Sequence, residues 1–447
     1  MPMKQNNMRK TLVDFIHSHK AILIVMALLL GVRLLGMYQM GYLYSLNSDD
    51  AAYVKSGIHF ANTGIISMHN EYPSAQIMPG MTVLIGALSL IFGEGTLLWL
   101  VLKLLWVAMG SWTAWYIYRS VTLYAPKWCG VLAVLPLFRP DYIWMDNLLL
   151  TETPFILCLI AMVYYTLKMG QETQSHRSFW LCALFYMGGL MLKANIAPYP
   201  LFALVYLLIV KYDRKLLLKQ CGILACIVLL FVIPWSIRNY IRFDTFVPLT
   251  YGAGNPTLLG TYQGTGYPLD EELDYETNVS HVVREKYERY YDENGQIKPE
   301  FERYVYLQAD GVKASYRQKE WLKKDAQGFL SSLLISKPWR MMRSVFYWDT
   351  ILRTGAHTLR MLPYMEMLFC VAAAIGSFLL KKYRAPILFA LGVYMGNIYI
   401  YATTFSFDRY NASVVYLRYI AMGIGIAVLL RLIRKMRGSI TGRKSQA

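Results

Sequence analysis

The chain has 447 residues, of which 56% are hydrophobic, and its mean hydropathy is +0.32. Apolar segments of roughly 20 residues, the length that crosses a bilayer, recur from one end of the chain to the other, so a soluble globular class is excluded. The net charge of +17 then predicts basic loops that orient a membrane protein, and not nucleic-acid binding.

Ten segments are predicted to cross the membrane, which makes the chain an all-α polytopic membrane protein. They cover residues 21–43, 96–118, 127–143, 151–168, 178–193, 196–211, 217–235, 362–380, 385–403 and 412–431. A further apolar segment, Ile77–Phe92, would reach only about 24 Å as a helix at 1.5 Å per residue. The hydrocarbon core of a bilayer is about 30 Å thick, so the length of this segment leaves its status open.

The distribution of basic residues decides whether residues 77–92 cross the membrane, because cytoplasmic loops are enriched in Lys and Arg. The first span is preceded by Lys4, Arg9, Lys10 and Lys20, which places the N-terminus in the cytoplasm. If 77–92 lies in the interface, the later basic loops and the basic C-terminal tail are also cytoplasmic, whereas a crossing would move those loops outside. We therefore predict an interfacial helix at 77–92, a cell-membrane location and two cytoplasmic termini.

This topology divides the chain into three parts. Residues 1–235 form an N-terminal transmembrane catalytic module with a first outer loop at 44–95, and residues 236–361 form an extracytoplasmic loop domain. Residues 362–447 supply the C-terminal transmembrane helices and a basic cytoplasmic tail. A short outer turn is expected at 139–150.

Two adjacent carboxylates, Asp49 and Asp50, follow the first span on the outer face. Such a pair can act as a general base or bind a metal. The alternative is structural, because Ser48 or Asp49 can cap a helix at 50–62 and acidic residues suit its first turn.

A second acidic group on the same face comprises Asp141, Asp146 and Glu152. Glu152 opens a predicted span, so helix capping is again the alternative to a functional role. Two acidic clusters at span ends on one face are harder to explain by capping than either cluster alone.

Basic residues near the same face are candidates for binding a phosphate. Lys193 lies in a very short turn between two spans, and Arg238 follows Pro234 and Trp235. A cation at that depth needs a partner, and a lipid phosphate suits it because Arg binds phosphate in a bidentate way; the alternative is snorkelling to lipid headgroups. Arg409 and Arg418 are predicted to precede the last span on the outer side, and Arg418 is preferred because it is nearer the span.

The order of these parts resembles the GT-C superfamily of polyprenyl-phosphate-sugar-dependent glycosyltransferases. A first span is followed by an acidic helix that contains Tyr53, an apolar helix opened by Met78-Pro79-Gly80, a Thr-Glu span start, a Lys-bearing turn, and Pro-Trp-x-x-Arg-Asn at 234–239. The nearest relatives in this respect are the protein O-mannosyltransferases and the aminoarabinose transferase of lipid A (the family 39/83-like, RgtA/B/C/D-like group).

The resemblance implies a set of roles. Asp49 takes the catalytic acidic position, with Asp50 and Glu152 at neighbouring acidic positions, and Lys193 and Arg238 are expected to bind the donor phosphate. Arg418 is expected to join this phosphate group because of its position near the last span, not because of the resemblance. Tyr53, Asp146 and Arg409 are expected to contact substrate. Relatives often carry a basic residue just before the Pro of the interfacial helix, whereas this chain has Gln76-Ile77-Met78, so a phosphate contact from that helix is not expected.

The expected function is inverting transfer of a sugar from a polyprenyl-phosphate donor to a lipid, protein or cell-wall polymer on the extracytoplasmic face, with an Asp general base. No cofactor is required by this chemistry, and a divalent metal at the acidic cluster stays open. The alternative is a polytopic transporter or a flippase for lipid-linked sugars, although such proteins usually show repeat symmetry and broken spans.

Overall fold

The computed structural model describes residues 2–172, 176–264 and 268–444, with side chains described between residues 14 and 436. Its regular elements are helices, apart from two isolated bridges at Tyr291–Ile297 and Ile351–Thr354. The predicted all-α class is confirmed. The basic side chains at positions 4, 9 and 10 and those beyond residue 436 lie outside the described side chains.

Seven helices in the described part of the chain are long and apolar enough to cross a membrane. They are α1 (Pro2–Met40), α4 (Thr96–Thr122), α7 (Glu152–Met169), α10 (Arg214–Phe243), α16 (Leu362–Leu379), α17 (Lys381–Ala402) and α19 (Tyr416–Lys444). The last of these begins four positions after the start predicted for it at residue 412, because Asp408–Ala412 forms a separate short helix, α18.

Three predicted spans correspond to shorter helices. Residues 178–193 form α8 (His176–Leu192), and 196–211 form η2 (Ala194–Ile196) followed by α9 (Tyr199–Ile209). The prediction of one continuous span at 127–143 is wrong: α5 (Lys127–Val134) and η1 (Leu135–Phe138) end at Arg139, whose backbone is extended. Pro140 disfavours the helical conformation in the residue before it, and it opens a new helix, α6 (Pro140–Met145), within the expected turn.

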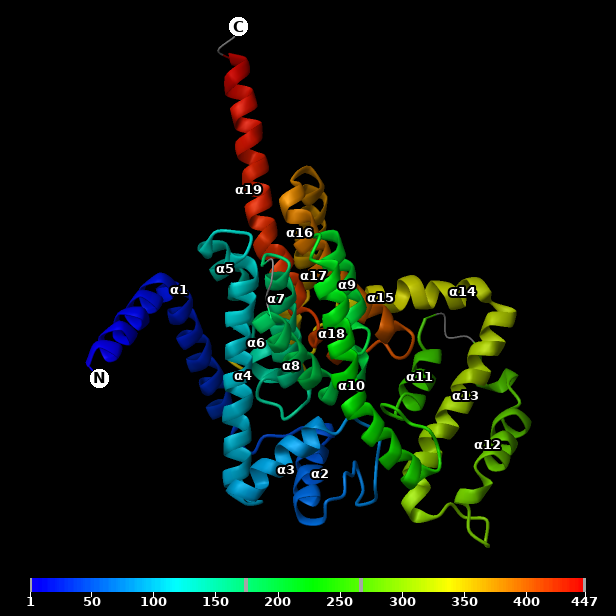
Figure 1. Cartoon of the computed structure of the whole chain (residues 1–447). Helices are drawn as coiled ribbons and strands as arrows, with labels where there is room; N and C mark the ends of the chain where they lie inside the picture. Colours follow the sequence, from blue (N-terminus) through cyan, green and yellow to red (C-terminus); the bar gives the residue numbers. More distant parts are fainter. Residues whose placement is uncertain (1, 173–175, 265–267, 445–447) are drawn as a thin grey trace.

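The first outer loop forms a packed helical pair, α2 (Asp49–Thr63) and α3 (Gly80–Phe92), at one end of the bundle (Figure 1). The two helices touch closely at Gly57, where an added Cβ would lie 2.5 Å from the Cβ of Ile85. Small residues permit such close approach. With 13 residues, α3 falls short of the seven long helices, as α9 and α5 do, and its interfacial position stays a prediction.

Residues beyond α10 build a second helical unit beside the bundle (Figure 1). It contains α11 (Gly254–Thr261), α12 (His281–Lys286), α13 (Glu302–Lys324), α14 (Ala326–Ser331) and α15 (Lys337–Met342). Its core is rich in tyrosine, with Tyr251, Tyr287, Tyr290 and Tyr304 buried against Phe243. The expected domain boundary at residue 235 lies within α10, which continues to Phe243 and carries the chain into this unit; the division into three parts stays a prediction.

Candidate functional site

Four charged residues from distant parts of the sequence meet where α2 approaches the bundle. Asp49 opens α2, Glu152 opens α7, Lys193 follows α8, and Arg409 lies in α18. The guanidinium of Arg409 donates from Nη1 to Asp49 Oδ2 at 2.6 Å and from Nε to Glu152 Oε1 at 2.6 Å. Lys193 Nζ donates to the same Glu152 oxygen at 2.7 Å. We call these four residues the charged cluster.

The charged cluster is mostly buried, so its ion pairs are only weakly screened by water. Glu152 is fully buried, and the side chains of Lys193 and Arg409 are each 12% exposed. Burial alone would lower the pKa of Arg409, but its interactions with Glu152, Tyr53 and Asp49 outweigh it and hold that pKa well above its usual value. Arg409 therefore stays cationic, and two cations balance two carboxylates in the cluster.

Asp49 is the member of the charged cluster that reaches water, with 36% of its side chain exposed. Its second oxygen, Oδ1, lies 3.6 Å from His69 Nε2. Burial and then Arg303 lower the pKa of His69, while Asp49 opposes the shift, so His69 is neutral at pH 7. The two oxygens of Asp49 thus face two different neighbours, Arg409 on one side and His69 on the other.

A polar cleft of about 590 Å³ opens on the His69 side of Asp49. Its walls are one face of α2 and the loop that follows, and they include Ser48, Ala52, Lys55, Asn62 and His69. Asp49 is not among the described residues that line this cleft, and its link to the cleft is His69, which lines it and lies 3.6 Å from Asp49 Oδ1. The Asp49 carboxylate therefore lies between the cleft residue His69 and the buried cation Arg409.

Asp50 and Tyr53, which were predicted to act beside Asp49, lie outside the charged cluster. Asp50 is 1% exposed and accepts hydrogen bonds from the backbone amides of Leu46 and Ser48 at 2.8 and 3.2 Å, so it stabilises the turn before α2. Tyr53 lies one turn after Asp49, is 5% exposed, and hydrogen-bonds Thr151 at the start of α7. Burial raises the pKa of Tyr53 above its ordinary value, and the residue packs α2 against α7.

Asp146 lies away from the charged cluster, although it was expected to contact substrate. It pairs with Arg33 of α1 at 2.7 Å and accepts from the Thr153 hydroxyl at 2.8 Å. Both partners of the ion pair are essentially inaccessible. Gly110 leaves room for the carboxylate, because an added Cβ would lie 2.1 Å from Asp146 Oδ2. The pair connects α1 to the α6–α7 segment.

Replacing Asp146 by Ala is expected to lower the free energy of unfolding by about 3–5 kcal/mol, because it leaves the buried Arg33 without a carboxylate. The double variant Asp146→Ala/Arg33→Met removes the stranded charge and should recover most of the loss. Thermal unfolding of the detergent-solubilised proteins measures both effects. Equal melting temperatures for the single and double variants would contradict the structural role.

Arg418 was expected before the last span, but it lies inside α19. Its side chain is 1% exposed, its Nη1 lies 3.5 Å from Glu366 of α16, and its Nη2 donates to the Tyr394 hydroxyl and to the Met342 carbonyl. Glu366 also accepts from Arg139 at 2.6 Å, and Arg139 in turn holds Asp141 at 2.8 Å. Arg418 and Asp141 therefore belong to a buried ion network that is separate from the charged cluster.

Arg238 is likewise placed apart from Lys193. Its guanidinium donates to the carbonyls of Ser74 and Ile66 at 2.9 and 3.3 Å, and it lies over the ring of Trp235 at 5.1 Å. Arg238 thus attaches the first outer loop to α10, a role that its position in the sequence did not reveal.

Sequence reasoning missed His69 and ranked Arg409 below Arg418. His69 adopts a left-handed backbone conformation, with φ of 66°, in a loop without periodicity, so the sequence carries no signal for its approach to Asp49. Arg409 differs from Arg418 in lying outside the long helices, next to Asp408 and Tyr410.

Comparisons with known proteins give one family match and several structural matches. Residues 77–237 match the family model described as dolichyl-phosphate-mannose-protein mannosyltransferase, which covers Glu152 and Lys193. No curated protein matches the chain.

Two solved structures match this chain over most of its length. The archaeal oligosaccharyltransferase AglB from Archaeoglobus fulgidus, in complex with an inhibitory peptide and a dolichol-phosphate, matches with a TM-score of 0.54 and 13% identity over 95% of this chain and 52% of that one. ArnT from Cupriavidus metallidurans bound to undecaprenyl phosphate matches with a TM-score of 0.41 and 13% identity, over 91% and 77% of the two chains. This chain spans about half the length of the archaeal protein, and the likeness to it shows a shared fold.

Proposed function

We propose that this chain belongs to the GT-C superfamily of membrane glycosyltransferases and transfers a sugar from a polyprenyl-phosphate donor to an acceptor on the extracytoplasmic face; the family match over residues 77–237 and the shared fold support this. The observation that carries the proposal is the position of Asp49, with one oxygen toward Arg409 and the other toward His69 and the polar cleft. A base in this position has a buried cation on one side, which can hold an anionic donor. On its other side is a residue of an open cleft, which can hold a neutral acceptor.

The donor side of the site is formed by Arg409 and Lys193. Both cations are mostly buried, and both are held by Glu152. A lipid phosphate that approaches them gains two charge-assisted partners whose positions are already fixed. Arg238 and Arg418 are committed to backbone carbonyls and to Glu366, respectively, so the proposal moves the phosphate contact from them to Arg409.

The acceptor side is the polar cleft. An acceptor hydroxyl at its edge would lie beside Asp49, with His69 as a second hydrogen-bond partner. The acceptor oxygen attacks the anomeric carbon as Asp49 takes the hydroxyl proton. The bond between that carbon and the phosphate oxygen breaks, and its electron pair leaves with polyprenyl phosphate. Attack opposite the leaving group inverts the anomeric centre, and Arg409 and Lys193 stabilise the charge that develops on the phosphate.

The test is turnover of lipid-linked sugars in proteoliposomes. The purified chain is supplied with radiolabelled polyprenyl-phosphate sugars and a crude envelope extract as acceptor, and free polyprenyl phosphate is measured. The proposal predicts release of polyprenyl phosphate together with a labelled product. A transporter or flippase, the alternative class, would move the donor across the bilayer and leave its sugar–phosphate bond intact.

Replacing Lys193 by Met is expected to raise the KM for the donor by about tenfold, the value of one charge-assisted hydrogen bond. Lys193→Arg keeps the charge and should recover part of the affinity. Steady-state kinetics with varied donor concentration measures the effect. A Met variant with an unchanged donor KM would remove Lys193 from the phosphate site.

A further inference from the structure

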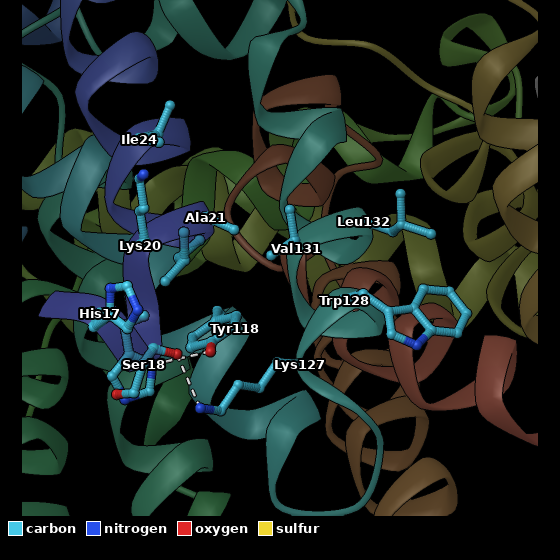
Figure 2. A pocket seen from close by; sticks show the side chains of 12 residues that line it. His17, Ser18, Lys20, Ala21, Ile24, Tyr118, Lys127, Trp128, Val131 and Leu132 are labelled. Carbon is cyan, nitrogen blue, oxygen red and sulfur yellow. Dashed lines mark hydrogen bonds between the residues drawn. The ribbon is translucent and has the colours of Figure 1, made fainter. Parts of the chain in front are cut away.

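A groove of about 760 Å³ is lined by residues of α1, α4 and α5. In Figure 1, α5 lies at the opposite end of the bundle from α2 and α3. The groove separates the first turns of the membrane-spanning part of α1 from α5, and Tyr118 of α4 lies between them (Figure 2). In the topology that the basic loops predict, this end faces the cytoplasm. The proposed transfer reaction makes no use of this groove.

The polar end of the groove is positively charged. Lys127 Nζ donates to the Ser18 carbonyl at 2.9 Å, and His19 Nδ1 lies 2.9 Å from the Tyr118 hydroxyl (Figure 2). The charges that act most strongly on His19 are those of Lys127 and Arg119, both positive. Lys127 is exposed and keeps two of its three N–H donors. No residue that lines the groove in the described part of the chain is acidic, so an anion would meet no opposing carboxylate.

The other walls of the groove are apolar. Ile24 is 50% exposed on the α1 side, and Leu132 and Trp128 are 41% and 47% exposed on the α5 side; Val131 completes the wall (Figure 2). Tryptophan favours the membrane–water interface. A free phosphate would leave these walls uncovered, and a purely apolar molecule would leave the charge of Lys127 without a counter-ion.

We propose that this groove binds an anionic phospholipid of the cytoplasmic leaflet. The headgroup phosphate lies against Lys127 and His19, and an acyl chain covers Ile24, Val131 and Leu132 beside Trp128. A bound lipid would join α1 to α5 at the end where the described side chains of α1 are mostly exposed. This site is distinct from the proposed donor site, which lies at the other end of the bundle.

The test uses Trp128 as a reporter in nanodiscs that contain phosphatidylglycerol or phosphatidylcholine with brominated acyl chains. Quenching is measured for the wild type and for Trp128→Phe, and the difference isolates Trp128 from the other tryptophans. Brominated phosphatidylglycerol at low mole fraction should quench Trp128 more strongly than brominated phosphatidylcholine. Lys127→Gln should lose about fivefold of this preference, the factor for one lysine near an anionic surface.

The matched control is Lys381→Gln, which removes the same charge from another basic loop at the same end of the molecule. The proposal predicts that this variant keeps the wild-type preference. Equal quenching by both lipids, or an equal loss in the two lysine variants, would overturn it, because the attraction would then be general to the basic surface. Absence of quenching by either lipid, with a dimer in solution, would assign the groove to a second copy of the chain.

Discussion

Replacing Asp49 by Asn should lower sugar transfer by about 10²- to 10⁴-fold, the usual contribution of a positioned general base. The change keeps the shape of the side chain and its contact with Arg409, so the folded protein should still bind the donor. Release of polyprenyl phosphate in proteoliposomes measures the rate, and the KM for the donor should change far less than kcat.

The matched control is the adjacent residue. Asp50 holds the turn before α2 through the amides of Leu46 and Ser48, so Asp50→Asn should reduce stability and retain turnover in the folded fraction. The sequence could not separate these neighbouring carboxylates, and this pair of variants does. Loss of turnover in Asp50→Asn with retention in Asp49→Asn would reverse the assignment.

Replacing Glu152 by Gln is expected to affect both stability and turnover. The change leaves Arg409 and Lys193 buried with Asp49 as their remaining carboxylate, and removal of one partner from a buried ion pair typically costs about 3–5 kcal/mol. Arg409 would then interact more strongly with Asp49 and occupy the proposed base. Thermal unfolding in detergent should show a lower melting temperature, and donor turnover should be lost.

A compensating variant separates the two effects of Glu152. In Glu152→Gln/Lys193→Met the removal of one cation restores the charge balance, so much of the stability should return while turnover stays low. A single variant with wild-type stability and wild-type turnover would show that Glu152 does not organise the two cations.

The parts of the fold that could be predicted are those with local causes. Long apolar segments gave the main membrane helices, an apolar run with Pro79 and Gly80 at its start gave the helix α3, and the acidic start of α2 was visible in the sequence. The break at Arg139 could also have been anticipated, since Pro140 follows it. The break was missed because the residues on both sides of Arg139 are mostly apolar, so residues 127–143 were predicted as one continuous span.

The site could be predicted only in part, because its partners are brought together by tertiary packing. Asp49 and Arg409 are separated by 360 positions in the sequence, and no local pattern indicates that they meet. Three other candidates have tertiary partners of their own: Asp146 has Arg33, Arg418 has Glu366, and Arg238 has loop carbonyls. Each of these three charged residues suited both a functional and a structural role, and the partner that decides between them lies far away in sequence. Asp50 differs, because its partners are the nearby backbone amides of Leu46 and Ser48.

The most direct test of the account is a cryo-electron-microscopy structure of Asp49→Asn with a polyprenyl-phosphate sugar bound. The account predicts that the phosphate lies within hydrogen-bond distance of Arg409 and Lys193, with the anomeric carbon beside residue 49 and the cleft lined by His69. A phosphate bound against Arg238 or Arg418, or a sugar remote from residue 49, would contradict it.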